Sequence, residues 1–335
     1  MKTIELKYDN FEQFLSSDEL NFLRNSGFIY RGEGKDNYIL LPSVLRKENE
    51  TKLYQLSKLG SPLLCQRDTE ELQRGAEFSL LQDFYLKANY NGLKIPRSEL
   101  LIKSEQLGIQ NITSAFNSSK WIPKDLEETA ALAQHYGVMT RLLDWTFNYN
   151  VAVYFASINA LKDICNGTNT KYIVLWALNY RQIEETSNGL KALKSELFPL
   201  NFVIPPYNEN KNLNAQKGIL SYWQSSITTL SERSKKDDDF SLTPIDRSPL
   251  DVLIEKATNK LEKDAPSLRE KQPYLFKIKI LSSEALKMLN YVKSNGYTTA
   301  SIFPGYDGVA KECAEQEVIK KAREKLKEKS RIKKP

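Results

Sequence analysis

Cysteine and histidine are scarce in this chain of 335 residues, which contains three cysteines and one histidine. The cysteines, Cys65, Cys165 and Cys313, lie far apart, so neither the paired ligands of a zinc site nor a Cys-x-x-Cys redox motif is present. Isolated cysteines in odd number are typical of reduced thiols. We therefore exclude a structural zinc site and assign no metal ligands, although a magnesium ion held by carboxylates stays open.

Long hydrophobic runs are also absent, because no stretch approaches the roughly 20 apolar residues that cross a bilayer. The first residues, Met1 to Glu5, lack the apolar segment of a secretory signal. We therefore expect a cytoplasmic protein without a membrane partner. With 41% hydrophobic and 10% aromatic residues, the chain can bury a sizeable core, which excludes wholesale disorder.

The net charge of +6 is concentrated at the C-terminal end. Residues 318–335 carry nine Lys and Arg against two Glu, a net +7, which leaves −1 for residues 1–317. The body of the protein is therefore close to neutral. We expect residues 318–335 to form a basic tail, helical or frayed, which is either solvated or a contact for nucleic acid.

Hydrophobic periodicity predicts an α+β fold with a central mixed or antiparallel sheet flanked by helices. Apolar residues at helical spacing predict helices over residues 10–24, 70–85, 123–133, 149–161 and 283–291, and Ser16-Ser17-Asp18 suit a new helix start within the first of these segments. Runs of β-branched and aromatic residues predict strands over residues 28–30, 172–178 and 274–280. These elements assign residues 1–317 to one domain.

Two segments lack such regular patterns. Residues 181–271 contain a Pro-Pro pair, an acidic run and Ser/Thr-rich spacers. We expect an irregular insertion that packs against the core, because Tyr222 and Trp223 need burial. Residues 302–310 are rich in glycine and predict a stretch of turns, in which Asp307 is a candidate site carboxylate or a turn cap.

The most informative stretch is QHYGVMTRLLDWT, residues 134–146. It holds an imidazole, a guanidinium, a carboxylate and an indole within a few positions, and the apolar run 151–156 follows it. A surface loop does not need so many of these side chains together. The stretch predicts a short connection that delivers polar groups to a cleft and is anchored by a buried helix.

Each charged group near this stretch has a structural alternative to a functional role. Arg31 follows an apolar strand and precedes Gly32, which suits a bound phosphate or carboxylate, but an ion pair with Glu77 or Asp144 is equally compatible. Arg141 and Asp144 form a salt bridge if the segment turns, and lie on opposite faces if it is extended. The glycine permits positive φ or the close approach of a ligand.

His135 and Trp145 carry the same ambiguity. The imidazole is a candidate general base, or it holds the loop through hydrogen bonds to its neighbours. The indole stacks on an aromatic ligand or packs in the core.

Taken together, these motifs resemble the FRG domain family over most of residues 1–315. Residues that carry the resemblance are Tyr30-Arg31-Gly32, Leu41-Pro42-Ser43-Val44-Leu45-Arg46, Glu77-Phe78, Ala133 to Thr146, Ala152 to Ala156, Gln216-Lys217-Gly218 and Phe303 to Gly308. Tyr30 stands where phenylalanine is usual, and Met139 where proline is common. A weaker similarity is to ADP-ribosyltransferases, although the late glutamate of those enzymes is not identifiable.

The resemblance implies an ADP-ribosyltransferase-like fold and a cleft that binds NAD as a substrate. The residues implied to bind NAD are Tyr30, Arg31, Gly32, Arg141 and Thr146. The residues implied to be catalytic are His135, Asp144 and Asp307. Arg31 would grip the pyrophosphate or ribose, His135 and Thr146 would position the ribose, and Arg141 would orient Asp144. Asp144 or Asp307 would stabilise positive charge on the ribose as nicotinamide leaves.

The implied activity is that of an ADP-ribosyltransferase or NAD glycohydrolase, acting as a toxin or antiviral defence effector of bacterial or phage-related origin. Its macromolecular acceptor is not identified by the sequence. The alternative is a non-enzymatic recognition module of phage defence, in which the polar cluster is a structural network and the insertion or tail contacts protein or nucleic acid.

Overall fold

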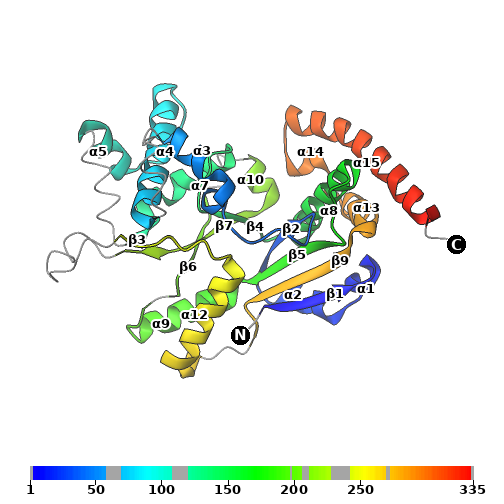
Figure 1. The fold of residues 1–335 in the computed structure, drawn as a ribbon, viewed down its shortest axis with the longest axis horizontal. Helices are drawn as coiled ribbons and strands as arrows, with labels where there is room; N and C mark the ends of the chain where they lie inside the picture. The colour runs from blue at the N-terminus through cyan, green and yellow to red at the C-terminus, as the bar shows by residue number, and fades with distance from the viewer. Residues whose placement is uncertain are drawn as a thin grey trace.

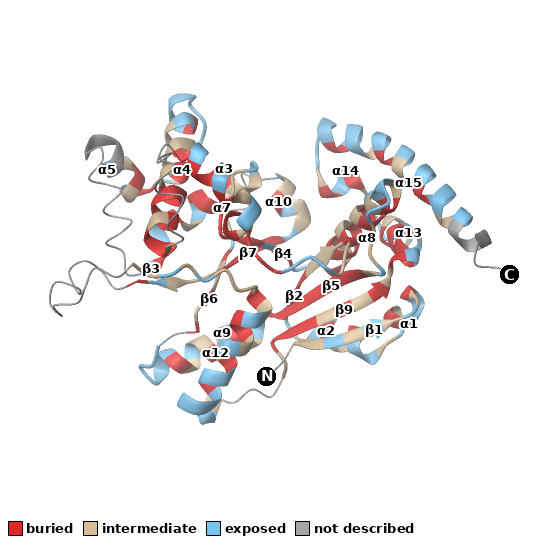
Figure 2. Ribbon diagram, in the orientation of Figure 1, coloured by how far each residue is buried: buried red, intermediate tan, exposed pale blue. Residues whose placement is uncertain are grey.

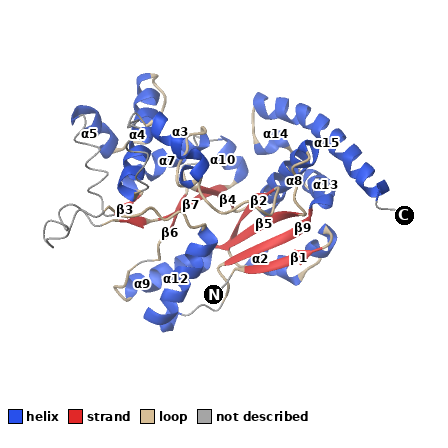
Figure 3. Ribbon diagram, in the orientation of Figure 1, coloured by secondary structure: helices blue, strands red, loops and turns tan. Residues whose placement is uncertain are grey.

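An α+β fold is built around a mixed seven-stranded sheet in the computed structural model (Figures 1 and 3). The structure describes residues 3–57, 69–107, 120–196, 198–205, 211–227, 242–268 and 272–332. The fold class and the mixed sheet expected from the sequence are confirmed.

The sheet has the strand order β1-β9-β5-β2-β4-β7-β6. Its strands are β1 (Ile4–Tyr8), β2 (Phe28–Glu33), β4 (Leu143–Thr146), β5 (Tyr172–Asn179), β6 (Leu200–Val203), β7 (Gly218–Trp223) and β9 (Leu275–Leu281). β1 pairs with β9 in parallel, and every other pair in the sheet is antiparallel. A separate pair joins β3 (Lys120–Trp121) to β8 (Ser225–Ser226).

The helices follow the hydrophobic pattern of the sequence and are ended by local capping. Those described are α1 (Phe11–Leu15), α2 (Asp18–Asn25), α3 (Glu50–Leu56), α4 (Glu70–Tyr90), α5 (Glu99–Leu107), α7 (Glu127–His135), α8 (Tyr149–Asn166), α9 (Tyr180–Ala192), α10 (Lys211–Gln216), α12 (Leu250–Asp264), α13 (Ala285–Ser294), α14 (Thr299–Ile302) and α15 (Tyr306–Ile332). The new helix start expected at residues 16–18 is confirmed, because the Ser17 side chain caps α2 by accepting from the Leu20 N–H. α8 ends at Gly167, whose φ of 70° is left-handed.

Helices cover both faces of the sheet (Figure 1). α8 and α13 pack on one face of β1, β9, β5 and β2. On the opposite face, α9 and α12 bury β5, β2 and the start of β9, whereas Glu5 and Lys7 of β1 are exposed there. α4 and α7 cover β6 and β7 on the α8 side of the sheet. Figure 2 shows β5 buried along most of its length, as its central position requires.

The sheet is nearly divided between β2 and β4. These neighbours are registered at one residue pair, Tyr30 opposite Thr146, whereas β2 and β5 are registered over six pairs from Phe28 to Glu33. The four strands β1, β9, β5 and β2 therefore meet the three strands β4, β7 and β6 at a single point. Beyond it the two strands diverge, and the main-chain groups along the divide need other partners.

Two segments are more regular than the sequence suggested. Residues 181–271 contribute β6 and β7 to the main sheet. Successive side chains of β7 point to opposite faces of the sheet and are buried on both. In place of a run of turns, α15 begins at Tyr306. The boundary expected at residue 318 falls inside this helix, and Ala322 is fully buried against the α8 side of the core. The proposed division into a domain and a tail stays a prediction.

No helix within the described ranges is both long enough and apolar enough to cross a membrane.

Candidate functional site

A pocket of about 240 Å³ lies where β2 and β4 diverge. Its walls come from both strands, from the inner face of α8 and from the end of α10. The lining residues are Tyr30, Arg31, Gly32, Glu33, Asp144, Trp145, Thr146, Val151, Ala152, Phe155, Asn159 and Gln216. Five of the residues expected in the site, Tyr30, Arg31, Gly32, Asp144 and Thr146, are therefore brought together.

Arg31 spans the divide between the two strands. Its Nη1 donates to the main-chain carbonyl of Asp144 at 2.9 Å, and its Nε and Nη2 both lie 2.7 Å from Oε1 of Glu33. Burial opposes the charged form, but Glu33 and Asp144 hold the pKa of Arg31 above its ordinary value. The guanidinium thus satisfies a carbonyl of β4 that faces the opening, and remains a fixed positive charge on the pocket wall.

Asp144 stands at the rim of this pocket. Its side chain is 68% exposed, and its Oδ2 lies 3.8 Å from Nη1 of Arg31. Its Oδ1 accepts from Nε2 of Gln134 at 2.8 Å, and Gln134 in turn accepts from the Thr140 hydroxyl. The carboxylate is therefore oriented by an amide and is only loosely paired with a cation.

Gly32 is explained by packing between backbones. A Cβ at this position would lie 1.9 Å from the carbonyl oxygen of Ala152 and 2.8 Å from the nitrogen of Ala156, both on α8. The expected positive φ is absent, so the glycine is required by the close approach of β2 to a helix. It lines the pocket because α8 forms the neighbouring wall.

Thr146 and Tyr30 form the inner end of the pocket. The Thr146 hydroxyl donates to the main-chain carbonyl of Gln216 at 2.6 Å and accepts from the N–H of Asn148 at 2.9 Å. The Tyr30 ring meets the Tyr149 ring edge to face, and burial raises the pKa of Tyr30 to about 12. The threonine therefore holds the turn that connects β4 to α8, in addition to lining the pocket.

Four polar or aromatic lining residues were missed at the sequence level: Glu33, Phe155, Asn159 and Gln216. For Glu33 a signal existed, because residues two apart in a strand share a face and Arg31 had been selected. Val151, Phe155 and Asn159 are spaced four residues apart, which places them on one face of α8. Gln216 belongs to the motif Gln216-Lys217-Gly218 that resembles the FRG family, but no site role was assigned to it.

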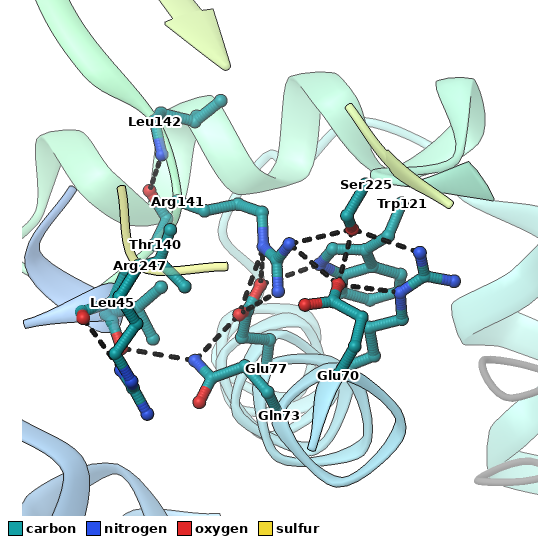
Figure 4. Close-up of polar contacts among 12 residues, drawn as sticks. Leu45, Glu70, Gln73, Glu77, Trp121, Thr140, Arg141, Leu142, Ser225 and Arg247 are labelled. Atoms are coloured by element: carbon teal, nitrogen blue, oxygen red, sulfur yellow. Dashed lines mark hydrogen bonds and ion pairs between the residues drawn. The ribbon is translucent and has the colours of Figure 1, made fainter. Parts of the chain in front are cut away.

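Arg141 does not orient Asp144, and this expectation is wrong. Arg141 lies at a bend two residues before β4 begins, and its guanidinium bonds to carboxylates of α4 and not to Asp144. Arg141 is buried with the carboxylates of Glu70 and Glu77 on α4 (Figure 4). Its role is to join the helical layer to the sheet, and it does not line the pocket.

The network around Arg141 is compact and balanced in charge. Nε and Nη2 of Arg141 bind Glu77 at 2.7 to 3.1 Å, and Nη1 binds Glu70 at 2.9 Å. The second cation, Arg74, is fully buried and its Nε lies 2.9 Å from Glu70. Trp121 Nε1 donates to Glu77 at 2.6 Å (Figure 4). Two guanidiniums therefore neutralise two buried carboxylates, and hydrogen bonds with Trp121 and Ser225 help to offset the cost of removing these charges from water.

The pKa of Glu70 follows from this arrangement. Burial by itself would raise its pKa, but the nearby charges of Arg141 and Arg74 outweigh burial and lower it below the ordinary value. Burial alone would lower the pKa of Arg141, but the carboxylates of Glu70 and Glu77 raise it above its ordinary value. Both partners therefore stay ionised in the folded protein.

His135 and Asp307 are not among the residues that line the pocket. His135 is the last residue of α7, with its ring edge to face on Tyr136, and burial lowers its pKa despite the charge of Asp144. Asp307 is exposed in the first turn of α15. Their predicted catalytic roles thus lack support from a shared site with Arg31.

Within the described ranges, no three His, Cys, Asp or Glu side chains are grouped as metal ligands. A comparison with protein families matches residues 26–164 to the FRG domain. This range includes β2, the Arg141 network on α4 and nearly all of α8. No curated protein matches the chain significantly, and no solved structure does so.

Proposed function

We propose that the protein binds NAD in the pocket between β2 and β4 and breaks the bond between NAD ribose and nicotinamide. The match of residues 26–164 to the FRG domain supports the family resemblance from which this proposal starts. One observation carries the proposal: Arg31, Asp144 and Thr146, chosen from separate positions in the sequence, line one pocket. An arginine on an early strand and a threonine at a strand end are the features that resemble ADP-ribosyltransferases. We also propose that the fold is ADP-ribosyltransferase-like, with the NAD site between the two halves of the sheet.

The size of the pocket limits what part of NAD it would hold. A volume of about 240 Å³ is below the roughly 300 to 1,000 Å³ of pockets that enclose a whole drug-sized ligand. We therefore place the nicotinamide and its ribose in the pocket, with the ring against Phe155 and Val151. The pyrophosphate would lie at the mouth near Arg31.

The proposed reaction is a substitution at the ribose. The bond between ribose C1′ and the nicotinamide nitrogen breaks, and its electron pair neutralises the positive charge of the ring. Positive charge then develops on the ribose, and a water molecule or an acceptor nucleophile forms the new bond to C1′ and releases its proton. A preorganised carboxylate near C1′ would stabilise the charge as it develops.

Asp144 fits this role better than Glu33. Glu33 is paired with Arg31 through two short contacts, whereas Asp144 lies 3.8 Å from the same guanidinium. Asp144 is exposed in the free protein, which weakens its field in water. A ligand at the rim would exclude that water and strengthen the interaction.

The test is release of free nicotinamide from NAD by the purified chain. We expect turnover in the wild type and a loss of about 100-fold in Asp144→Asn, the scale of one electrostatic group. Asp307→Asn is the matched variant, because it removes an exposed carboxylate outside the pocket. Equal losses in both variants, or none in either, would contradict the assignment of Asp144.

A biological role as a toxin or antiviral effector is part of the same proposal. If it is correct, expression of the wild type in bacterial cells should deplete cellular NAD and stop growth. Expression of Asp144→Asn to the same level should do neither.

A non-enzymatic recognition module is the second candidate, and the bonding of Arg31 favours it. Three contacts from this guanidinium are made within the protein, which is also the arrangement of a purely structural arginine. NAD titration separates the two candidates. Saturable binding of NAD without release of nicotinamide would leave recognition as the function. If NAD does not bind, it is neither the substrate nor the ligand of this pocket.

A further inference from the structure

A second, larger pocket lies at the N-terminal end of α8. Its volume is about 670 Å³, within the range of pockets that hold a whole small ligand. Arg24 at the end of α2, the turn before α8, Lys217 after α10 and the end of α13 form its walls. It shares Tyr30 with the pocket between β2 and β4, so the two pockets lie on either side of this ring.

The lining of this second pocket is positive and contains no carboxylate. Arg24 and Lys217 are its two cations, and the other lining side chains are aromatic rings and amides. Among the described residues, Arg24 contacts the Tyr291 hydroxyl at 3.4 Å and the face of the Tyr149 ring at 4.7 Å, and neither contact neutralises its charge. Lys217 Nζ lies 3.2 Å from the amide oxygen of Asn214. An anion would therefore enter without displacing an ion pair.

The base of α8 adds two features that favour an anion with hydrogen-bonding groups. The positive end of this 18-residue helix faces the pocket through Asn148, Tyr149 and Asn150. Tyr149 is 6% exposed, and its hydroxyl makes no hydrogen bond of standard geometry in the part of the chain that the structure describes; burial raises the pKa of this phenol, and the nearby Arg24 guanidinium opposes that rise. The amide oxygen of Asn150 is buried without a hydrogen-bond partner among the described residues. Unsatisfied polar groups of this kind are costly unless a ligand or water completes them.

Lys217 is held in a strained conformation at the edge of the same pocket. Its φ of 47° lies in the left-handed region, which disfavours a lysine. The conformation is fixed on both sides, since its N–H donates to the Asn214 carbonyl and its own carbonyl accepts from the Phe147 N–H. The backbone of Lys217 is therefore held in place at the edge of the pocket.

From these observations we infer that the second pocket binds a nucleotide, with its phosphate between Arg24 and Lys217 and its base against the aromatic wall. Tyr297 and Phe147 offer aromatic rings on which the base could stack, and stacking of this kind accepts any of the nucleobases. The phenol of Tyr149 and the amide of Asn150 would complete their hydrogen bonds with the ligand. This inference does not depend on NAD cleavage in the pocket between β2 and β4.

Calorimetric titration of the full chain with AMP, adenosine and inorganic phosphate tests the inference. AMP should bind saturably at one site, and adenosine and phosphate should each bind at least tenfold more weakly, because each lacks half of the contacts. Equal affinity for AMP and adenosine, or no saturable AMP binding at millimolar concentration, would overturn it. A single-stranded oligonucleotide that binds tenfold more tightly than AMP would also overturn it, by identifying nucleic acid as the ligand.

Variants place the ligand within the molecule. Arg24→Gln and Lys217→Asn should each weaken AMP binding at least tenfold, and the asparagine tolerates the left-handed backbone. Arg97→Gln is the matched control, because that arginine is 80% exposed and lies outside the pocket. Glu33→Gln, in the other pocket, should leave AMP affinity unchanged. If instead Glu33→Gln weakens AMP and Arg24→Gln does not, the nucleotide binds between β2 and β4 and this inference fails.

Tyr149→Phe separates binding from folding. Removal of a buried hydroxyl that makes no hydrogen bond of standard geometry should leave the melting temperature unchanged or raise it, while AMP affinity falls severalfold. Loss of stability with unchanged affinity would show that the hydroxyl is structural, and would contradict its place in the site.

Discussion

Replacement of Arg141 by methionine should unfold the protein readily, although this residue lies in the most polar motif of the sequence. The substitution preserves much of the side-chain length but removes four contacts to Glu77 and Glu70 and one to Ser225, at 2.7 to 3.1 Å. Breaking a buried ion pair from one side typically costs 3 to 5 kcal/mol, because it leaves an uncompensated charge in the interior. We therefore expect a loss of about 3 to 5 kcal/mol in the free energy of unfolding.

Urea unfolding of Arg141→Met beside Asp144→Asn measures this loss. The Asp144 side chain is 68% exposed, so its neutralisation should change stability by about 0 to 1 kcal/mol. A third variant, Glu77→Gln, completes a double-mutant cycle with Arg141→Met. Because these residues bind directly, the cycle should show a coupling energy of about 0.5 to 3 kcal/mol.

The pH dependence of stability should also differ between the wild type and Arg141→Met. The lowered pKa of Glu70 contributes stability above its unfolded value of 4.5, and this contribution is lost as the pH falls through the folded pKa. In Arg141→Met the carboxylates lose their shared cation, so this contribution shrinks and the stability of the variant should fall less steeply below about pH 5. A loss under about 1 kcal/mol in Arg141→Met, with additive energies in the cycle, would refute the view that the network stabilises the fold.

The sequence predicted the pocket better than it predicted the partners of its motif. Arg31 and Asp144 could be chosen from local patterns, because one follows an apolar strand and the other precedes an apolar helix. Tyr30, Gly32 and Thr146 were assigned to the site through the family resemblance. That β2 and β4 would meet at Tyr30 and Thr146 could not be read, since strand pairing is a property of distant segments. The divide that opens the pocket is therefore a tertiary feature.

The role of Arg141 was missed for the same reason. Its partners Glu77 and Glu70 lie 64 and 71 positions earlier in the chain. One signal was available, because Glu70, Arg74 and Glu77 occupy a single stripe of an amphipathic helix at spacings of four and three. Charges on the stripe that faces the core predict a buried network, whereas Glu77 was considered as a partner only for Arg31.

Similar limits apply to the segment 181–271 and to the C-terminal helix. β6 and β7 are short, and their burial depends on pairing with β4 and with each other. The last residues are so highly charged that their composition predicts solvation. Ala322 nevertheless packs on the core, because a helix exposes its charges on one side and can bury the other.

The remaining predictions concern packing, the C-terminal helix and ligand recognition. Gly32→Ala should destabilise the fold by at least about 1 to 3 kcal/mol, because the new Cβ would meet the backbone of α8 at 1.9 Å; urea unfolding checks this. Deletion after Glu317 should cost about 2 to 3 kcal/mol through loss of the apolar contacts of Val318, Ala322 and Leu326, whereas deletion after Glu328 keeps these contacts and should cost little. Arg31→Lys keeps the positive charge but removes the planar fork that joins Glu33 to the carbonyl of Asp144. We expect a folded protein whose affinity for NAD falls about tenfold or more, measured by titration beside the wild type, because an ammonium group cannot hold both partners and still present a donor to a phosphate. Wild-type affinity in a folded Arg31→Lys protein would mean that the guanidinium supplies charge alone, and would remove the fork from the proposed recognition of NAD.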